Sequence, residues 1–215
     1  MFRRLRAPIG LVLLALVAAA CGSSADSGLQ SVRDSGDPPS MFFQVPSDWT
    51  VFQSSDLEGV AETPFVSHTS DLTLPVASRV VFQGIGADAG VPDANVSDAE
   101  YPVGSAVVRT IPASQRDAIS RYWLAELVVP YHDQPVASEQ LKQDISLGGG
   151  FDGVHLIVAY NDAVTDSDAA VVLISVTDPE VSRMYSIAVG CSLSCFNDNV
   201  DAILAVVDSW LVNTR

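Results

Sequence analysis

The chain has 215 residues, of which 48% are hydrophobic and 17% are charged. It is therefore long enough for one ordinary domain with a buried core plus a targeting segment. Its formal net charge is −15, and the part after residue 20 keeps 8 basic and 26 acidic residues, a balance near −18. A charge of that sign repels phosphate backbones and anionic headgroups, which excludes nucleic acid as a partner. We interpret the acidity as a solubility feature, with recruitment of a cationic partner or a metal ion as the alternative.

The N-terminus has the layout of an export signal. Met1–Arg6 is short and basic, and an apolar run follows from Ala7 to Ala20. A basic segment before an apolar segment of this length is typical of a signal peptide. The run is also shorter than the roughly 20 residues that a membrane-spanning helix needs. We therefore predict that residues 1–20 are a signal peptide and not an anchor by themselves.

The end of the apolar run reads AAAC at residues 18–21 and is followed by GSS. This stretch resembles the lipobox of bacterial lipoprotein signals. The resemblance implies that Cys21 receives a diacylglyceryl group and becomes the new N-terminus. Two or more acyl chains would make the attachment stable where one chain is marginal. Ala18 stands where the family usually has leucine, so plain cleavage after Ala20 stays open as the alternative.

Residues 22–40 read GSSADSGLQSVRDSGDPPS and consist mainly of Gly, Ser, Asp and Pro. A segment of this composition cannot bury enough apolar surface to offset the entropy lost on ordering. Together with Cys21 it predicts a flexible tether over residues 21–40, with an r.m.s. reach of about 25 Å. The tether would hold a single folded domain of residues 41–215 away from the membrane.

The first part of this domain alternates between short strands and loops. Apolar and β-branched runs predict strands at residues 42–46, 49–52, 77–83 and 105–111, separated by polar, Pro-containing loops. The spacing then changes to that of a helix over residues 114–128. Ser114 is the expected N-cap, and apolar residues fall on one broad face.

The last third predicts a sheet covered by a helix. Strands are expected at residues 141–147, 153–160, 169–176 and 183–189. Short polar turns connect the last three, so we expect an antiparallel meander. Residues 197–212 predict an amphipathic helix. The predicted class is α+β, an antiparallel sheet packed against amphipathic helices in a two-layer or three-layer sandwich.

Two stretches resemble a known fold family. The sequence FFQVPSDWTVF at residues 42–52 looks like the opening of a PsbP-like domain, and the meander and helix ending in DSW at residues 208–210 look like its close. With the lipobox and the tether, the chain resembles the actinobacterial LpqN-type lipoproteins with a PsbP-like domain. The resemblance implies an accessory or binding protein and not an enzyme, and a shared fold alone indicates no particular ligand.

The two remaining cysteines, Cys191 and Cys195, follow the last predicted strand and precede the last helix. Outside the cytoplasm such a pair is most simply a disulfide. A turn between them is required, because bridged Cα atoms lie about 4.4–6.8 Å apart. Closing so short a loop contributes about 2 kcal/mol in the chain-entropy model. A C-x₃-C copper or redox site is the alternative, and it would need a His or Met partner nearby.

Sequence motifs for catalysis or metal binding are missing. The chain contains no G-x-S-x-G, no H-E-x-x-H and no paired C-x-x-C. Its three histidines are His68, His132 and His155, and His155 lies on the face of its predicted strand opposite the apolar residues. The acidic segments at residues 88–100 and 162–168 do not have the spacing of a calcium loop. We therefore predict no catalytic residue, no metal ligand and no cofactor.

Three functional hypotheses fit these patterns. The first is an extracytoplasmic binding or accessory module, lipid-anchored at Cys21 to the cell membrane, that engages an envelope protein, lipid or glycan. An exposed apolar patch between helix and sheet would favour it. The second is a structural or assembly protein of an envelope complex. The third is a cryptic hydrolase, which requires one of the three histidines to meet a serine and an aspartate in one cleft.

Overall fold

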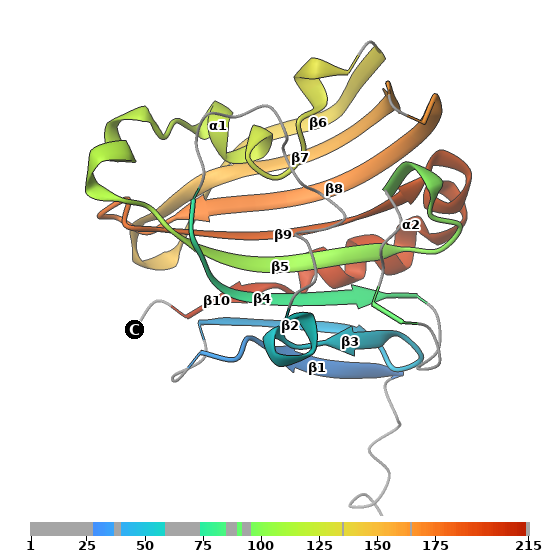
Figure 1. The fold of residues 1–215 in the computed structure, drawn as a ribbon, viewed down its shortest axis with the longest axis horizontal. Coiled ribbons are helices and arrows are strands. Elements are labelled where there is room, and N and C mark those ends of the chain that lie inside the picture. The colour runs from blue at the N-terminus through green and yellow to red at the C-terminus, as the bar shows by residue number, and fades with distance from the viewer. Residues whose placement is uncertain are drawn as a thin grey trace, which may run out of the picture.

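A computed structural model describes residues 28–36, 40–58, 74–84, 90–91, 96–134, 136–163 and 165–213. These residues form two antiparallel sheets, a three-stranded sheet in the order β1-β2-β10 and a seven-stranded sheet in the order β3-β4-β5-β9-β8-β7-β6 (Figure 1). The strands are β1 (Leu29–Arg33), β2 (Met41–Pro46), β3 (Thr50–Phe52), β4 (Val76–Gln83), β5 (Val103–Thr110), β6 (Val136–Leu147), β7 (Phe151–Asp162), β8 (Ser167–Thr177), β9 (Arg183–Ser192) and β10 (Leu211–Val212). The α-helices are α1 (Arg121–Glu126) and α2 (Leu193–Asp208), and the 3₁₀ turns are η1 (Ser54–Leu57), η2 (Val96–Asp98), η3 (Ala113–Ala118), η4 (Tyr131–Asp133) and η5 (Gly148–Gly150).

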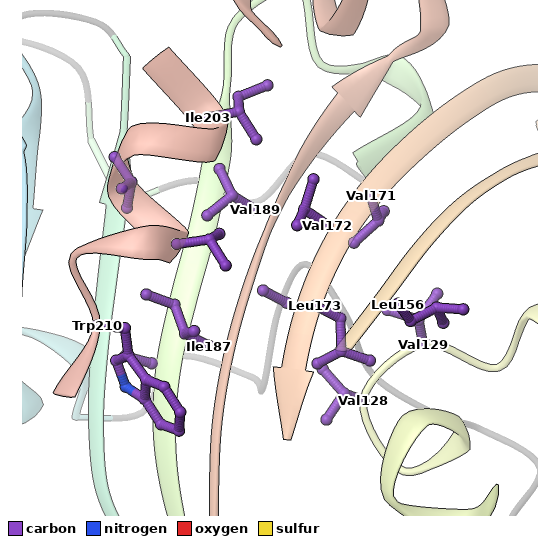
Figure 2. Packing of buried hydrophobic residues seen from close by; sticks show 14 of the residues in the cluster. Val128, Val129, Leu156, Val171, Val172, Leu173, Ile187, Val189, Ile203 and Trp210 are labelled. Carbon is purple, nitrogen blue, oxygen red and sulfur yellow. The ribbon is translucent and has the colours of Figure 1, made fainter. Parts of the chain in front are cut away.

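The middle of the large sheet is covered on both faces. Strands β8 and β9 are buried along nearly their whole length, as their continuous apolar sequences require. Helix α2 packs on β8 and β9, while α1 packs on β7 and β8. Figure 1 shows the two helices on opposite faces of the sheet, and Figure 2 shows Ile203 of α2 on the side of Val189 and Val129 beside Leu156. The core therefore has two layers, one on each side of these strands. Among the described residues, no helix has the length and apolar character that a membrane span needs.

The small sheet covers the face that carries α2, over β4. The inward residues of β2 are buried and alternate with exposed ones. The centroid of the Phe43 ring lies 5.2 Å from that of Phe82 in β4, and the centroid of the Trp49 ring lies 6.2 Å from it. Gly104 is the cross-strand partner of Phe82, and a Cβ atom there would lie 2.2 Å from the Phe82 ring. Glycine at 104 thus lets the Phe82 ring lie across the neighbouring strand.

The α+β class predicted from the sequence is confirmed, and the antiparallel meander is longer than predicted because β6 joins it. The single helix predicted at residues 114–128 is wrong. Two short segments, η3 and α1, replace it, separated by Ile119 in an extended conformation, and the N-cap is Ser120. All residues from 124 to 129 are buried. A run of that length cannot lie on one face of a helix, so packing overrides the helical spacing.

The predicted tether is also wrong over part of its length. Residues 29–33 form β1, which pairs with β2 along its full length, and Val32 is buried. The carboxylate of Asp34 accepts hydrogen bonds from the backbone N–H groups of Ser40 at 2.6 Å and Met41 at 2.8 Å, which closes the β1–β2 hairpin. Polar residues that suggested a flexible tether therefore make the hydrogen bonds that close this hairpin. Residues 1–27, with the predicted signal peptide and Cys21, and residues 37–39 lie outside the described part of the chain.

Candidate functional site

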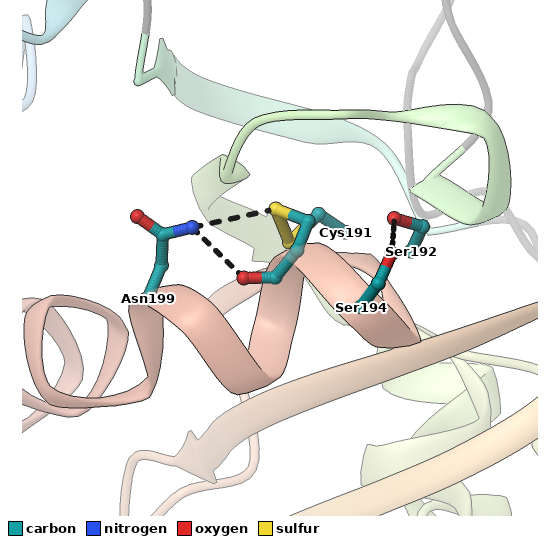
Figure 3. Close-up of a disulfide and its surroundings, with 5 residues drawn as sticks. Cys191, Ser192, Ser194 and Asn199 are labelled. Atoms are coloured by element: carbon teal, nitrogen blue, oxygen red, sulfur yellow. Dashed lines mark hydrogen bonds between the residues drawn. A yellow bond between two sulfur atoms is a disulfide. The ribbon is translucent and has the colours of Figure 1, made fainter.

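Cys191 and Cys195 form a disulfide between the end of β9 and the first turn of α2, with their Cα atoms 5.9 Å apart (Figure 3). Both residues are buried. The side chain of Asn199 donates a hydrogen bond to the carbonyl oxygen of Cys195 at 2.8 Å. Of the two alternatives that the sequence left open, the geometry corresponds to the disulfide. The bond fixes the point at which α2 starts across the sheet.

His132 lies in a network of charged and polar side chains at the edge of the sheet. Its Nδ1 pairs with the buried carboxylate of Glu126, and its Nε2 lies 3.9 Å from Oε1 of Glu139. The hydroxyl of Tyr131 donates to Glu139 at 2.9 Å, and the Lys142 amine donates to the Tyr131 hydroxyl at 3.0 Å. Both ring nitrogens of His132 therefore face carboxylates. This differs from the serine–histidine–aspartate order that the hydrolase hypothesis requires.

The pKa values in this network follow from its contacts. Burial raises the pKa of Tyr131 to about 12, although the hydrogen bond from Lys142 opposes the shift. Partial burial favours the neutral forms of Glu139 and Lys142. Their hydrogen bonds to each other and to Tyr131 outweigh it, so the pKa of Glu139 is lowered and that of Lys142 is raised. A carboxylate and an ammonium group held in their charged forms act as a structural tie between η4 and β6.

A half-buried apolar surface lies beside α2. The helix covers β8 and β9, but most of the apolar residues of β6 and β7 on the same face remain half-buried. The register places Leu141 opposite Ile157, and Ile157 opposite Val172 under the helix. We call the half-buried set the open β6–β7 face. It consists of Leu141, Ile145, Ile157, Ala159, Ile174 and His155. These side chains form a half-buried, mainly apolar surface beside α2. Apolar patches on a protein surface can mark interaction sites.

His155 is the titratable group of this face. Its Nε2 atom is buried and has no hydrogen-bond partner among the described residues. Burial lowers the pKa of His155, and the negative charge of Asp208 at the end of α2 opposes that shift. The neutral ring is therefore favoured in the folded protein. The sequence placed His155 correctly on the face opposite the buried residues of β7.

We expect His155 to titrate below its usual value near 6.5. Because the folded pKa lies below the unfolded one, its contribution to stability is present above that value and is lost as the pH falls toward the folded pKa. A titration of the ring proton signals by NMR measures the midpoint directly. In Asp208→Asn the midpoint should fall further, since the opposing charge is gone. A midpoint above that of an unfolded peptide would contradict this assignment of burial.

The other predicted site residues are spread over the fold. The carboxylate of Asp162 is buried and accepts a hydrogen bond from the Ser97 hydroxyl at 3.1 Å, whereas Asp166 and Asp168 are exposed. Within the described ranges no cluster of three His, Cys, Asp or Glu side chains is arranged to hold a metal ion. His68 and Cys21 lie outside those ranges. Within the described part of the chain, the contacts of His132 and His155 do not form the serine–histidine–aspartate set of the hydrolase hypothesis, and for His68 that hypothesis is untested.

The open face and the His132 network were not predicted from the sequence. One signal for the face was present, because β7 carries apolar residues on both sides of its pleat, as Leu156 and Ile157 do. A strand with one solvated face would alternate apolar and polar residues. The network gave no such signal, since its members come from α1, η4 and β6 and meet only in the folded chain.

No family model matches this sequence, and no curated protein matches it. Solved structures are similar over most of the chain at low identity. Cyanobacterial PsbP from Synechocystis sp. PCC 6803 is 14% identical with a TM-score of 0.48, over 91% of this chain and 99% of that one. The Ran-binding protein Mog1p of Saccharomyces cerevisiae is 10% identical with a TM-score of 0.48, over 86% and 95%.

LpqN of Mycobacterium tuberculosis, described as involved in cell envelope biogenesis, is 15% identical with a TM-score of 0.47, over 87% of this chain and 93% of that chain. PsbP and LpqN, the two names that the sequence resemblance gave, are thus both among the similar structures. A likeness at this level concerns the chain fold and carries no argument about function.

Proposed function

We propose that this protein is a lipid-anchored accessory or binding module on the extracytoplasmic face of the cell membrane. The observation that carries the proposal is the lipobox-like AAAC at residues 18–21, placed directly after a basic segment and an apolar run of signal-peptide length. Lipidation at Cys21 would hold the domain at the membrane through two or more acyl chains. The partner would be an envelope protein, lipid or glycan.

Two structural features support the proposal. The disulfide between Cys191 and Cys195 is of a kind that persists mainly in oxidising compartments outside the cytoplasm. The open β6–β7 face offers half-buried aliphatic side chains next to the helix. Concave or half-open apolar surfaces with few polar groups are the usual location of binding sites. We therefore assign the partner to this face.

Replacing Cys21 by serine should move the protein from the membrane fraction to the soluble extracytoplasmic fraction, because the acceptor of the acyl chains is removed. Cell fractionation measures the distribution, and intact mass spectrometry of the membrane form should show the diacylglyceryl mass on an N-terminal Cys21. Ser23→Ala is the matched control and should stay in the membrane. An unmodified wild-type chain that begins at Cys21 would instead show plain cleavage after Ala20.

Binding is tested on the same preparation. Native mass spectrometry of the protein taken from its own membrane should show a co-purifying lipid, glycan or protein. If the protein arrives lipidated but with no companion in repeated preparations, the anchor stands and the binding role is contradicted.

A further inference from the structure

The small sheet has an outer face that no other described element covers. Its outward residues on β1 and β2 are exposed or half-exposed, while the alternate residues are buried except for Gln30, which is half-buried. Three large apolar side chains lie on it, with exposed fractions of 41% for Leu29, 38% for Phe42 and 64% for Leu211. These are three of the five exposed large apolar residues of the described chain. We call this surface the β1–β2–β10 outer face.

The register brings Arg33, Phe42 and Leu211 into a row across the small sheet, while Leu29 lies opposite Pro46 at the other end of β1. Phe42 is the cross-strand partner of Arg33 on one side and of Leu211 on the other. Cross-strand neighbours on one face of a sheet have Cβ atoms about 4.5–5.5 Å apart. A cation, an aromatic ring and an aliphatic side chain therefore stand next to each other. Together they resemble the basic and apolar residues that bind at membrane interfaces.

The charge of this face differs from that of the whole chain. The protein carries a net charge of −15, yet the outward residues of the three strands include Arg33 and no acidic residue. Asp34, the acid next to β1, is 2% exposed and turned inward to Ser40 and Met41. Among the described residues, the exposed acids nearest to the three strands in the sequence are Asp48, in the turn after β2, and Asp208, three residues before Leu211. A negatively charged membrane surface would repel the rest of this acidic protein, so the protein would approach it most favourably with the β1–β2–β10 outer face.

The length of chain before β1 brings this face close to the proposed anchor. Eight residue steps separate Cys21 from Leu29, and they span at most about 28 Å even when fully extended. Leu29 is itself part of the outer face. Figure 1 shows the small sheet at one edge of the molecule, with β6 at the opposite edge of the large sheet. A lipid at Cys21 would thus hold the small sheet, and not the open β6–β7 face, next to the bilayer.

We propose that the β1–β2–β10 outer face rests on the outer surface of the same bilayer that holds the acyl chains of Cys21. Phe42 and Leu211 enter the interface, and Arg33 pairs with lipid phosphates. The proposal rests on the proposed lipid anchor and adds an orientation to it. The anchor supplies attachment, the face sets which side meets the membrane, and the open β6–β7 face is left directed away from it.

Tryptophan quenching tests this orientation. The lipidated protein, purified from membranes, is reconstituted into phosphatidylcholine–phosphatidylglycerol vesicles with brominated acyl chains and into matched vesicles without bromine. Leu211→Trp should lose emission in the brominated vesicles beyond the loss seen in the wild type. Gln143→Trp, exposed on β6, should show no additional loss. The native Trp49, Trp123 and Trp210 are present in every variant and set the baseline.

Adding Arg33→Glu to Leu211→Trp should reduce that quenching, and the reduction should shrink at high salt. Equal quenching of the Leu211→Trp and Gln143→Trp proteins overturns the proposal. If quenching is equal and sedimentation also shows a dimer, the β1–β2–β10 outer face instead contacts a second copy of the chain.

If the protein purified from membranes carries no acyl chains, the proposed lipid anchor at Cys21 is refuted. The proposed contact between the β1–β2–β10 outer face and the bilayer is then still testable. Cys191 and Cys195 are bonded to each other, and Cys21 is the one remaining cysteine of the sequence. It can be coupled to maleimide-bearing lipid in the same vesicles. The comparison of the Leu211→Trp and Gln143→Trp proteins then decides the orientation by itself.

Discussion

Replacing Phe82 by alanine should lower the free energy of unfolding by about 3–5 kcal/mol, the usual cost of removing a fully buried ring. Phe82 is fully buried in β4 and contacts the rings of Phe43 and Trp49. These three rings connect the small sheet to the large one. Urea unfolding followed by circular dichroism measures the loss, and hydrogen exchange should show the β1–β2 hairpin losing protection before β7 and β8 do.

Gly104 supplies the companion test. Gly104→Ala should cost about 1–3 kcal/mol, because its Cβ atom would overlap the Phe82 ring and the neighbouring side chains have little room to move. In the double variant with Phe82→Ala the ring is gone, so the combined cost should be smaller than the sum of the two single costs. The carbonyl oxygen of Ala188, 2.9 Å from the same Cβ position, keeps part of the cost. Strictly additive effects would show that the ring is not what requires glycine at 104.

The sequence predicted best the elements whose signal is local. Strands β7, β8 and β9 each carry a long apolar or alternating run between polar turns, and the structure places them within a few residues of the expected bounds. Helix α2 begins at Leu193, four residues before the expected N-cap Asn197. Its early start follows from the disulfide, which ties its first turn to β9. Local patterns thus identify an element, while contacts decide where it begins.

The elements that were missed depend on distant contacts. Strand β1 has five residues, and even a two-stranded hairpin is marginally stable by itself in water, so the strand depends on contacts with the rest of the fold. It exists because β2 pairs with it and because Asp34 closes the hairpin. Composition describes a segment in isolation and therefore predicted a tether there. The helix expected at residues 114–128 failed for the same reason, since residues 124–129 pack as a continuous buried run against the sheet.

The candidate surfaces follow the same division. The cysteine pair was predicted from spacing and compartment, both of which are properties of the sequence. The open β6–β7 face depends on how far α2 reaches across the sheet, and the β1–β2–β10 outer face depends on which strands neighbour Phe42. Both surfaces therefore depend on the order of strands in the sheets. Local sequence does not reveal that order, because β2 and β10 are neighbours in the sheet but lie near opposite ends of the sequence.

Removing the disulfide by Cys191→Ala and Cys195→Ala together should lower the free energy of unfolding by about 2 kcal/mol in the chain-entropy model. In a domain of this size that corresponds to a melting temperature lower by about 4–8 °C. Thermal unfolding with and without dithiothreitol measures the effect. The reductant should lower the melting temperature of the wild type and leave that of the double variant unchanged.

Cys21→Ala is the control for this experiment, because it removes the remaining cysteine and keeps the bonded pair, so its response to dithiothreitol should equal that of the wild type. The same measurement connects the bond to the compartment. A chain made without residues 1–20 in a reducing cytoplasm should have the stability of the double variant until it is oxidised, since the bond forms only in an oxidising environment. If the cytoplasmic chain is already as stable as the exported one, the disulfide does not stabilise the fold, and its support for an extracytoplasmic location is lost.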